Sequence, residues 1–201
     1  MKFQVALCLA AALFLGLLPA ASFAQDVDIN VTHSILPDQP YTLIYPAVMQ
    51  PSGGGDQPLV INHPKAPLQC GMTIVPTEQT TWSADEALAD LDDDAATQSW
   101  AETFPGFTLG DKGTTPYQNV TALTYQGTST NSPQGVPITL VHTEAVDNGN
   151  GYVLDCFFAT EVARQARPVV DFIIANFSTD VDAECCVPVE ASTTEPSSTG
   201  E

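Results

Sequence analysis

The chain has 201 residues, of which 24 are acidic and five are basic, giving a formal net charge of −19 at pH 7. A surface this negative repels the phosphates of nucleic acids and of anionic lipids, so neither is expected as a partner. The length is sufficient for one domain with a sizeable core, and the sequence contains no internal repeat.

Residues 1–24 have the pattern of a secretory signal peptide. Lys2 precedes an apolar run from Val5 to Leu18, and Ser22 and Ala24 occupy the positions that a signal peptidase reads. The run is short for a membrane span. We therefore expect cleavage after Ala24, export to the periplasm or the medium, and no stable membrane insertion of the mature chain. Cleavage removes Lys2 and no acidic residue, which moves the formal net charge from −19 to −20.

The mature chain is expected to form a single domain at residues 37–178. A polar lead-in at 25–36 precedes it, and a disordered tail rich in Ser, Thr and Glu follows at 179–201. Such a tail has too few large apolar groups to offset the entropy cost of ordering.

Residues 41–76 are expected to contribute three strands, at 41–46, 59–63 and 68–76. A Gly-rich loop at 51–58 separates the first two. The third strand shows the period of two that is typical of strands, with one face formed by Leu68, Cys70, Met72 and Ile74.

A helix is predicted within residues 80–107. Ser83 and Glu86 form a capping box at its start, and the sequence Pro-Gly at 105–106 ends it. An apolar stripe at helical spacing follows the cap and consists of Leu88, Leu91 and Ala95.

The second half of the domain is expected to form four strands and a closing helix. The strands are predicted at 107–111, 120–127, 136–146 and 152–160, with a hairpin turn at 147–151. The closing helix is predicted at 167–178, with Pro168 at its first position. This order of elements predicts an α+β fold, with a mainly antiparallel sheet flanked by helices.

Four cysteines, Cys70, Cys156, Cys185 and Cys186, follow the predicted cleavage site. An even number in an exported chain indicates two disulfides, with three possible pairings. A bond between the adjacent Cys185 and Cys186 would close a small ring, so each is expected to have a different partner or to be poorly ordered. The chain has neither a CxxC motif nor a basic neighbour for a thiolate, which favours structural disulfides over a redox role.

An acidic run carries aspartates at positions 90, 92, 93 and 94. As a calcium loop starting at Asp90, it has Ala95 where a glycine is needed and Ala101 where a glutamate is needed. A helix continuing through the run places Asp90 and Asp94 on one face. The favoured interpretation is a solvated helix face, with weak calcium binding as the alternative.

The histidines are His33, His63 and His142. No G-x-S-x-G elbow and no zinc-type quartet of Cys and His accompanies them, so no catalytic residue, metal ligand or cofactor is assigned. His142 is expected on the strand face opposite Leu140. A catalytic triad of distant residues that includes His142 or His63 stays open, since triads are recognised by geometry.

Several segments resemble the PsbP-like superfamily, which includes the photosystem protein PsbP and bacterial DcrB-like envelope proteins. They are YTLIYP (41–46), VTALTYQG (120–127), GYVLDCFFAT (151–160) and IIANFS (173–178), within about residues 37–178. The resemblance implies an α/β/α sandwich around an antiparallel sheet, and a non-catalytic module that binds or stabilises another protein. It carries no catalytic residue to this chain.

Three functions follow from these observations. The favoured one is an exported non-catalytic domain that binds an unknown protein or envelope component. A small exported hydrolase with a dispersed site and an acidic ion-binding protein are the alternatives. The stretch Tyr41 to Pro46 and the loop 51–58 are expected at a sheet edge, where they would form the partner surface.

Overall fold

The computed structural model describes residues 32–54, 57–79, 82–133 and 135–186. The predicted signal peptide and the tail from residue 187 onward lie outside the described residues. In chain order the elements are β1 (His33–Ile35), β2 (Thr42–Pro46), β3 (Gln50–Gly54), β4 (Gln57–Asn62), β5 (Leu68–Pro76), α1 (Ala84–Asp90), α2 (Asp93–Thr103), β6 (Thr108–Pro116), β7 (Thr121–Ser129), β8 (Ile138–Asp147), β9 (Asn150–Ala159), a 3₁₀ turn (Thr160–Val162), α3 (Ala163–Ala175) and β10 (Phe177–Ser178).

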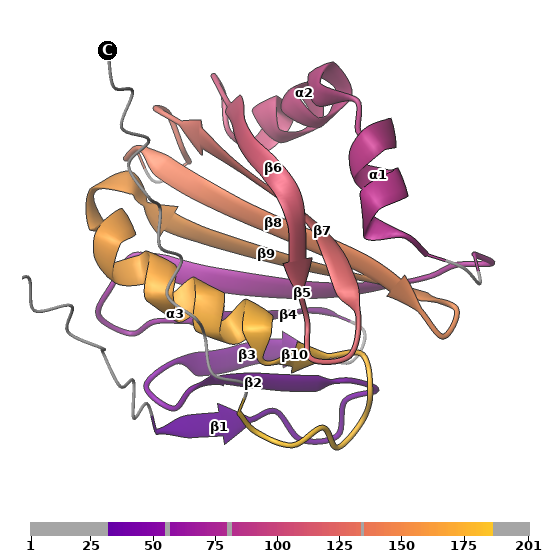
Figure 1. Ribbon diagram of the computed structural model, residues 1–201. Coiled ribbons are helices and arrows are strands. Elements are labelled where there is room, and N and C mark those ends of the chain that lie inside the picture. The colour runs from indigo at the N-terminus through magenta and orange to yellow at the C-terminus, as the bar shows by residue number, and fades with distance from the viewer. Residues whose placement is uncertain (1–31, 55–56, 80–81, 134, 187–201) are drawn as a thin grey trace, which may run out of the picture. The chain divides into compact units, whose positions relative to one another are not determined.

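The strands form two antiparallel sheets (Figure 1). The larger sheet has seven strands in the order β3-β4-β5-β9-β8-β7-β6, and the smaller one has the order β1-β2-β10. Helix α3 packs on one face of the larger sheet and also against β2, whereas α1 and α2 contact β6 and β7. We call the face under α3 the inner face and the opposite one the outer face. The predicted α+β fold with an antiparallel sheet is confirmed.

The inner face carries the main hydrophobic core. Side chains from β5, β8 and β9 alternate toward it, because successive residues of a strand point to opposite faces. Phe177, fully buried at the start of β10, contacts the rings of Tyr41, Tyr117 and Tyr152. Helix α3 closes this core with Ala166, Val170, Phe172, Ile173 and Ile174.

A disulfide between Cys70 and Cys156 crosses this core. The two residues lie directly opposite each other on β5 and β9, with their Cα atoms 4.0 Å apart. Both are buried, at 1% and 0% exposure. The bond therefore ties β9, the central strand of the larger sheet, to its neighbour β5, and joins residues that are 86 positions apart in the sequence.

The pairing of the remaining two cysteines differs from the prediction. Cys185 and Cys186 are bonded to each other, not to different partners. Among the cysteines of the described residues, Cys70 and Cys156 face each other inside the sheet, which leaves Cys185 and Cys186 to pair with each other.

The predicted helix at 80–107 is two helices, which is a second correction. Ser83 caps α1 as expected, accepting a hydrogen bond from the backbone N–H of Glu86. Leu91 and Asp92 are extended, and the side chain of Asp92 accepts from the N–H groups of Asp94 and Ala95 to start α2. Aspartate favours this capping role over a helix interior, so Asp90 and Asp94 do not share a helical face.

The closing helix begins earlier than predicted. Helix α3 starts at Ala163, so Pro168 lies inside it and not at its first position. It also ends at Ala175, because Phe177 and Ser178 pair with Leu43 and Thr42 as strand β10.

The predicted partner surface at residues 41–46 is wrong. All five residues of β2 are buried, and Tyr41 is 4% exposed, since β2 is the central strand of the smaller sheet. Most of the predicted loop at 51–58 belongs to β3 and β4, which form a hairpin at the edge of the larger sheet. Ordered structure also reaches beyond residues 37–178, with β1 before it and a buried Thr179 after it.

Candidate functional site

A row of five residues crosses the outer face of the larger sheet. The strand register aligns Tyr125 on β7, His142 on β8, Asp155 on β9, Gly71 on β5 and Val60 on β4. Directly opposed residues on paired strands lie on the same face, so the five form one continuous line. Helix α2 covers the end at Tyr125, and the line emerges into solvent beyond His142.

His142 is the centre of this row and is 6% exposed. Its Nδ1 lies 2.7 Å from a carboxylate oxygen of Asp155, and its Nε2 lies 3.5 Å from a carboxylate oxygen of Glu144. The imidazole ring stacks on Tyr125 with centroids 4.3 Å apart and an interplanar angle of 19°. Both ring nitrogens are therefore engaged by carboxylates, and one ring face is covered by an aromatic side chain.

Two opposing effects act on the pKa of His142. Burial lowers it, because the charged imidazolium loses hydration, whereas hydrogen bonds and charges of Asp155 and Glu144 raise it. The carboxylates outweigh burial and raise the pKa to about 9. His142 is thus protonated at neutral pH, and with its two acidic partners it forms a cluster with one net negative charge.

Trp100 of α2 closes the cluster from above. Its indole Nε1 donates a hydrogen bond of 2.8 Å to the hydroxyl oxygen of Tyr125. Its ring meets the edges of His142 and Phe157 and lies against Phe104. Burial raises the pKa of Tyr125 to about 12, which keeps the phenol neutral. Helix α2 is thus anchored to the sheet through the same residues that enclose His142.

The sequence-based expectation for His142 is wrong in one respect. His142 lies on the same face as Leu140 and not on the opposite one, because residues two apart along a strand share a face. Sequence reasoning also missed Tyr125, Asp155 and Trp100. The strand alternation held a signal for Tyr125 and Asp155, but only the register brings them beside His142.

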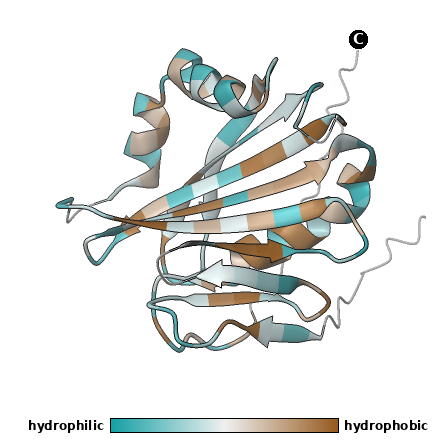
Figure 2. Ribbon diagram, turned by 180° about the vertical axis from the view of Figure 1, so that it is seen from behind, coloured by the Kyte–Doolittle hydropathy of each residue, from teal (hydrophilic) through white to brown (hydrophobic). Residues whose placement is uncertain are grey.

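The outer face is only half covered. The helices contact β6 and β7, and on this face the strands β4, β5 and β9 have no helix of the described residues over them (Figure 2). We call this region the open face. Its side chains are exposed or half-buried, and they are Val60, Gln69, Thr73, Val75, Val153 and Asp155. Val75 is 52% exposed, so the open face presents aliphatic groups to solvent.

The other residues that the sequence singled out have contacts that stabilise the fold. The Nδ1 of His63 accepts hydrogen bonds from the backbone N–H groups of Lys65 and Ala66, which fixes a turn between β4 and β5. In the acidic run, Asp93 forms an ion pair with Lys112 of β6. This run therefore starts a helix and ties it to the sheet.

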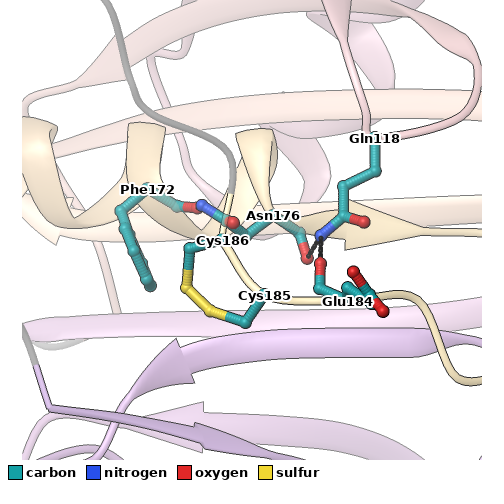
Figure 3. The surroundings of a disulfide bond; sticks show 6 residues. All are labelled: Gln118, Phe172, Asn176, Glu184, Cys185 and Cys186. Atoms are coloured by element: carbon teal, nitrogen blue, oxygen red, sulfur yellow. Dashed lines mark hydrogen bonds between the residues drawn. A yellow bond between two sulfur atoms is a disulfide. The ribbon is translucent and has the colours of Figure 1, made fainter.

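His33 lies apart from the outer face, on β1. Its ring and the sulfur atoms of Cys185 and Cys186 offer ligand atoms that all lie within 4.8 Å of one another. Figure 3 shows the cysteine pair beside Phe172 and Asn176.

The fold defined by these sheets is that of the PsbP-like proteins. No known protein family matches the sequence, and no curated protein matches it closely enough to serve as a relative. Among solved structures, the chain is similar to a cyanobacterial PsbP from Synechocystis, with a TM-score of 0.52 and 11% identity. The match covers 76% of this chain and 94% of that one.

Weaker similarities extend to two further structures. LpqN of Mycobacterium tuberculosis, involved in cell envelope biogenesis, gives a TM-score of 0.45 at 14% identity, covering 74% of this chain and 92% of that one. The immunity protein TplEi of Pseudomonas aeruginosa, complexed with a peptide, gives a TM-score of 0.40 at 14% identity over 72% and 55% of the two chains. Among the described residues, no helix is long and apolar enough to cross a membrane.

Proposed function

We propose that this protein is an exported, non-catalytic module that binds another protein or an envelope component through the open face. The observation that carries the proposal is the half-covered outer face, where aliphatic side chains adjoin an acidic cluster. The occupant that fits is a protein segment with aliphatic groups flanked by Lys or Arg.

The state of the histidines supports a non-catalytic role. A general base must be neutral to accept a proton, whereas a pKa of about 9 keeps His142 protonated at neutral pH. Both of its ring nitrogens face carboxylates, and the Nδ1 of His63 is occupied by backbone N–H groups. The two histidines considered for a hydrolytic triad are thus committed to local structure.

Charge complementarity supports a basic partner. Glu144 and Asp155 bring two negative charges to the border of the open face, and His142 neutralises only one of them. The chain as a whole carries a formal net charge of −19, which attracts cationic partners and speeds their encounter. Val75 and Val153 supply apolar area next to this charge, as the centre of a binding surface does.

Site-specific photocross-linking tests the proposal. A benzophenone amino acid replaces Val75 on the open face, or Gln165 on the exposed side of α3 as the matched control. The protein is expressed with its own leader in its native host, irradiated and purified. We expect an adduct from position 75 only, and we expect its cross-linked peptide to contain Lys or Arg.

A charge variant separates this outcome from random capture. Thr73→Lys places a cation beside position 75 and is expected to reduce the adduct several-fold, as does high salt, whereas Gln165→Lys leaves it unchanged. Equal adduct yields from positions 75 and 165, or a yield from position 75 that does not change with Thr73→Lys, would refute the open face as the binding surface. N-terminal sequencing of the same protein tests export, with Gln25 expected as its first residue.

A further inference from the structure

The adjacent cysteines lie in a segment that the structure holds firmly. Thr42 accepts a hydrogen bond of 2.9 Å from the N–H of Ala183 and donates one to the carbonyl of Asp180. Gln118 donates to the carbonyl of Glu184, as Figure 3 shows. These contacts come from β2 and from the loop after β6, so the position of the cysteine pair does not depend on its own disulfide.

His33 approaches the same point from a separate element. It belongs to β1, where the register pairs it with Pro46 of β2. Its ring nitrogen and the two sulfurs lie within 4.8 Å of one another. Ligand atoms around a tetrahedral zinc ion, at about 2.0–2.3 Å from it, are roughly 3.5 Å apart, so small side-chain rotations bring the three to that spacing.

We propose that His33, Cys185 and Cys186 form a redox-gated site for a thiophilic metal ion such as Zn²⁺. In the oxidised protein the two sulfurs are bonded to each other and cannot act as thiolate ligands. A dithiol reductant transfers two electrons and two protons to the disulfide, giving two thiols, and itself becomes a disulfide. Binding of Zn²⁺ then displaces the two thiol protons and leaves two thiolates and one imidazole on the metal.

Accessibility makes this disulfide the reducible one. Cys186 is exposed and Cys185 is half-buried, whereas Cys70 and Cys156 are buried in the core. Thiol–disulfide exchange requires the attacking thiolate to reach a sulfur atom, so the core disulfide is protected in the folded protein.

The surroundings also favour a cation. Cys185 lines a groove of about 630 Å³ together with the carboxylate residues Asp38, Asp182 and Glu184. Two thiolates and one imidazole match the ligands that zinc prefers, and a fourth position is left for water. Ligands supplied by two elements that are already in place reduce the ordering cost of binding.

Cobalt titration of the reduced protein tests the site. The purified mature chain, which starts at Gln25 and lacks Cys8, is treated with a phosphine reductant. The phosphine reduces the disulfide with water and is oxidised to the phosphine oxide without supplying competing thiols. We expect two titratable thiols per chain, then binding of one Co²⁺ with a thiolate-to-cobalt charge-transfer band. Zn²⁺ should displace the Co²⁺. The untreated protein should show no such band.

Three variants make the test specific. His33→Ala should weaken metal affinity at least as much as loss of an outer-shell partner does, roughly 10- to 100-fold, whereas His63→Ala should leave it unchanged. Replacing Cys185 and Cys186 by serine should abolish the charge-transfer band. Absence of binding by the reduced protein, equal affinity in His33→Ala, or a band that survives without Cys185 and Cys186 would each overturn the proposal.

Discussion

The two faces of the larger sheet are built from alternate residues of the same strands, yet they differ in kind. The inner face is mainly apolar across β5, β8 and β9 and is covered by α3 and the smaller sheet. Its buried polar side chains on β8, Thr139 and Thr143, are hydrogen-bonded. The outer face holds a charged histidine cluster, with helices on one side of it and solvent on the other. The comparison indicates that folding stability resides mainly in the inner face, which leaves the outer face free to carry polar groups.

The largest effect is expected on the inner face. Phe177→Ala removes a fully buried ring that three tyrosines surround, so it should lower the free energy of unfolding by about 3–5 kcal/mol. Urea denaturation measures the loss. Val75→Ala on the open face is the control and should stay within about 0.5 kcal/mol of the parent protein. Similar losses of stability in both variants would contradict the conclusion that the inner face provides most of the folding stability.

The core disulfide gives the next largest effect. Replacing Cys70 and Cys156 together by alanine removes the link between β5 and β9, and we expect a loss of about 2–5 kcal/mol. The same denaturation experiment on the Cys185→Ser, Cys186→Ser variant provides the matched control. That variant should lose much less, because its disulfide joins neighbouring residues and constrains little of the unfolded chain. A larger loss there would contradict the assignment of stability to the inner face.

The histidine cluster on the outer face should make the stability of the protein depend on pH. The pKa of His142 is about 9 in the folded protein and about 6.5 in the unfolded chain. The protonated His142 therefore contributes its full stabilisation of the folded protein below pH 6.5, and this contribution is lost as the pH rises through 9. Its size is on the order of 3 kcal/mol. We expect the stability difference between the parent protein and His142→Gln to shrink accordingly from pH 6 to pH 10.

Two measurements check the histidine prediction. Urea denaturation of both proteins across this pH range gives the stability difference as a function of pH. An NMR titration of the His142 ring gives its pKa directly. A titration midpoint at or below 6.5 would show that the effect of burial on the pKa of His142 outweighs that of Asp155 and Glu144, and would contradict the prediction.

The sequence predicted the sheet better than the site, for a physical reason. Both ends of strand β5 were predicted correctly. The alternation of apolar residues with a period of two is a local pattern, and every residue of the strand contributes to it. The cluster around His142 depends on the pairing of β7, β8 and β9, which is set by long-range packing. Asp155 is 13 residues away along the chain and Trp100 is on a different element, so local patterns contain neither contact.

The errors at helix ends arise where the local sequence permits more than one structure. In the acidic run, the prediction of a continuous helix overlooked Asp92, because aspartate also suits the cap that starts a new helix. Pro168 similarly suits a first helical turn, yet the turn at Thr160–Val162 starts the helix earlier. In both cases packing against the sheet selects between local alternatives of similar energy, and the composition of the segment alone does not.

The smallest effect tests the corrected role of the acidic run. Asp92→Ala removes the side chain that accepts from the N–H groups of Asp94 and Ala95, and the expected loss is about 1 kcal/mol. Asp90→Ala is the matched control. Asp90 ends α1, where a negative charge opposes the helix dipole, so its removal should be neutral or slightly stabilising. Because α2 carries Trp100 over His142, Asp92→Ala should also increase solvent exposure of the Trp100 indole, which tryptophan fluorescence can detect in a Trp82→Phe background. Equal stability of the two variants would instead indicate that Asp92 is not a helix cap and that the acidic run is part of one continuous, solvated helix.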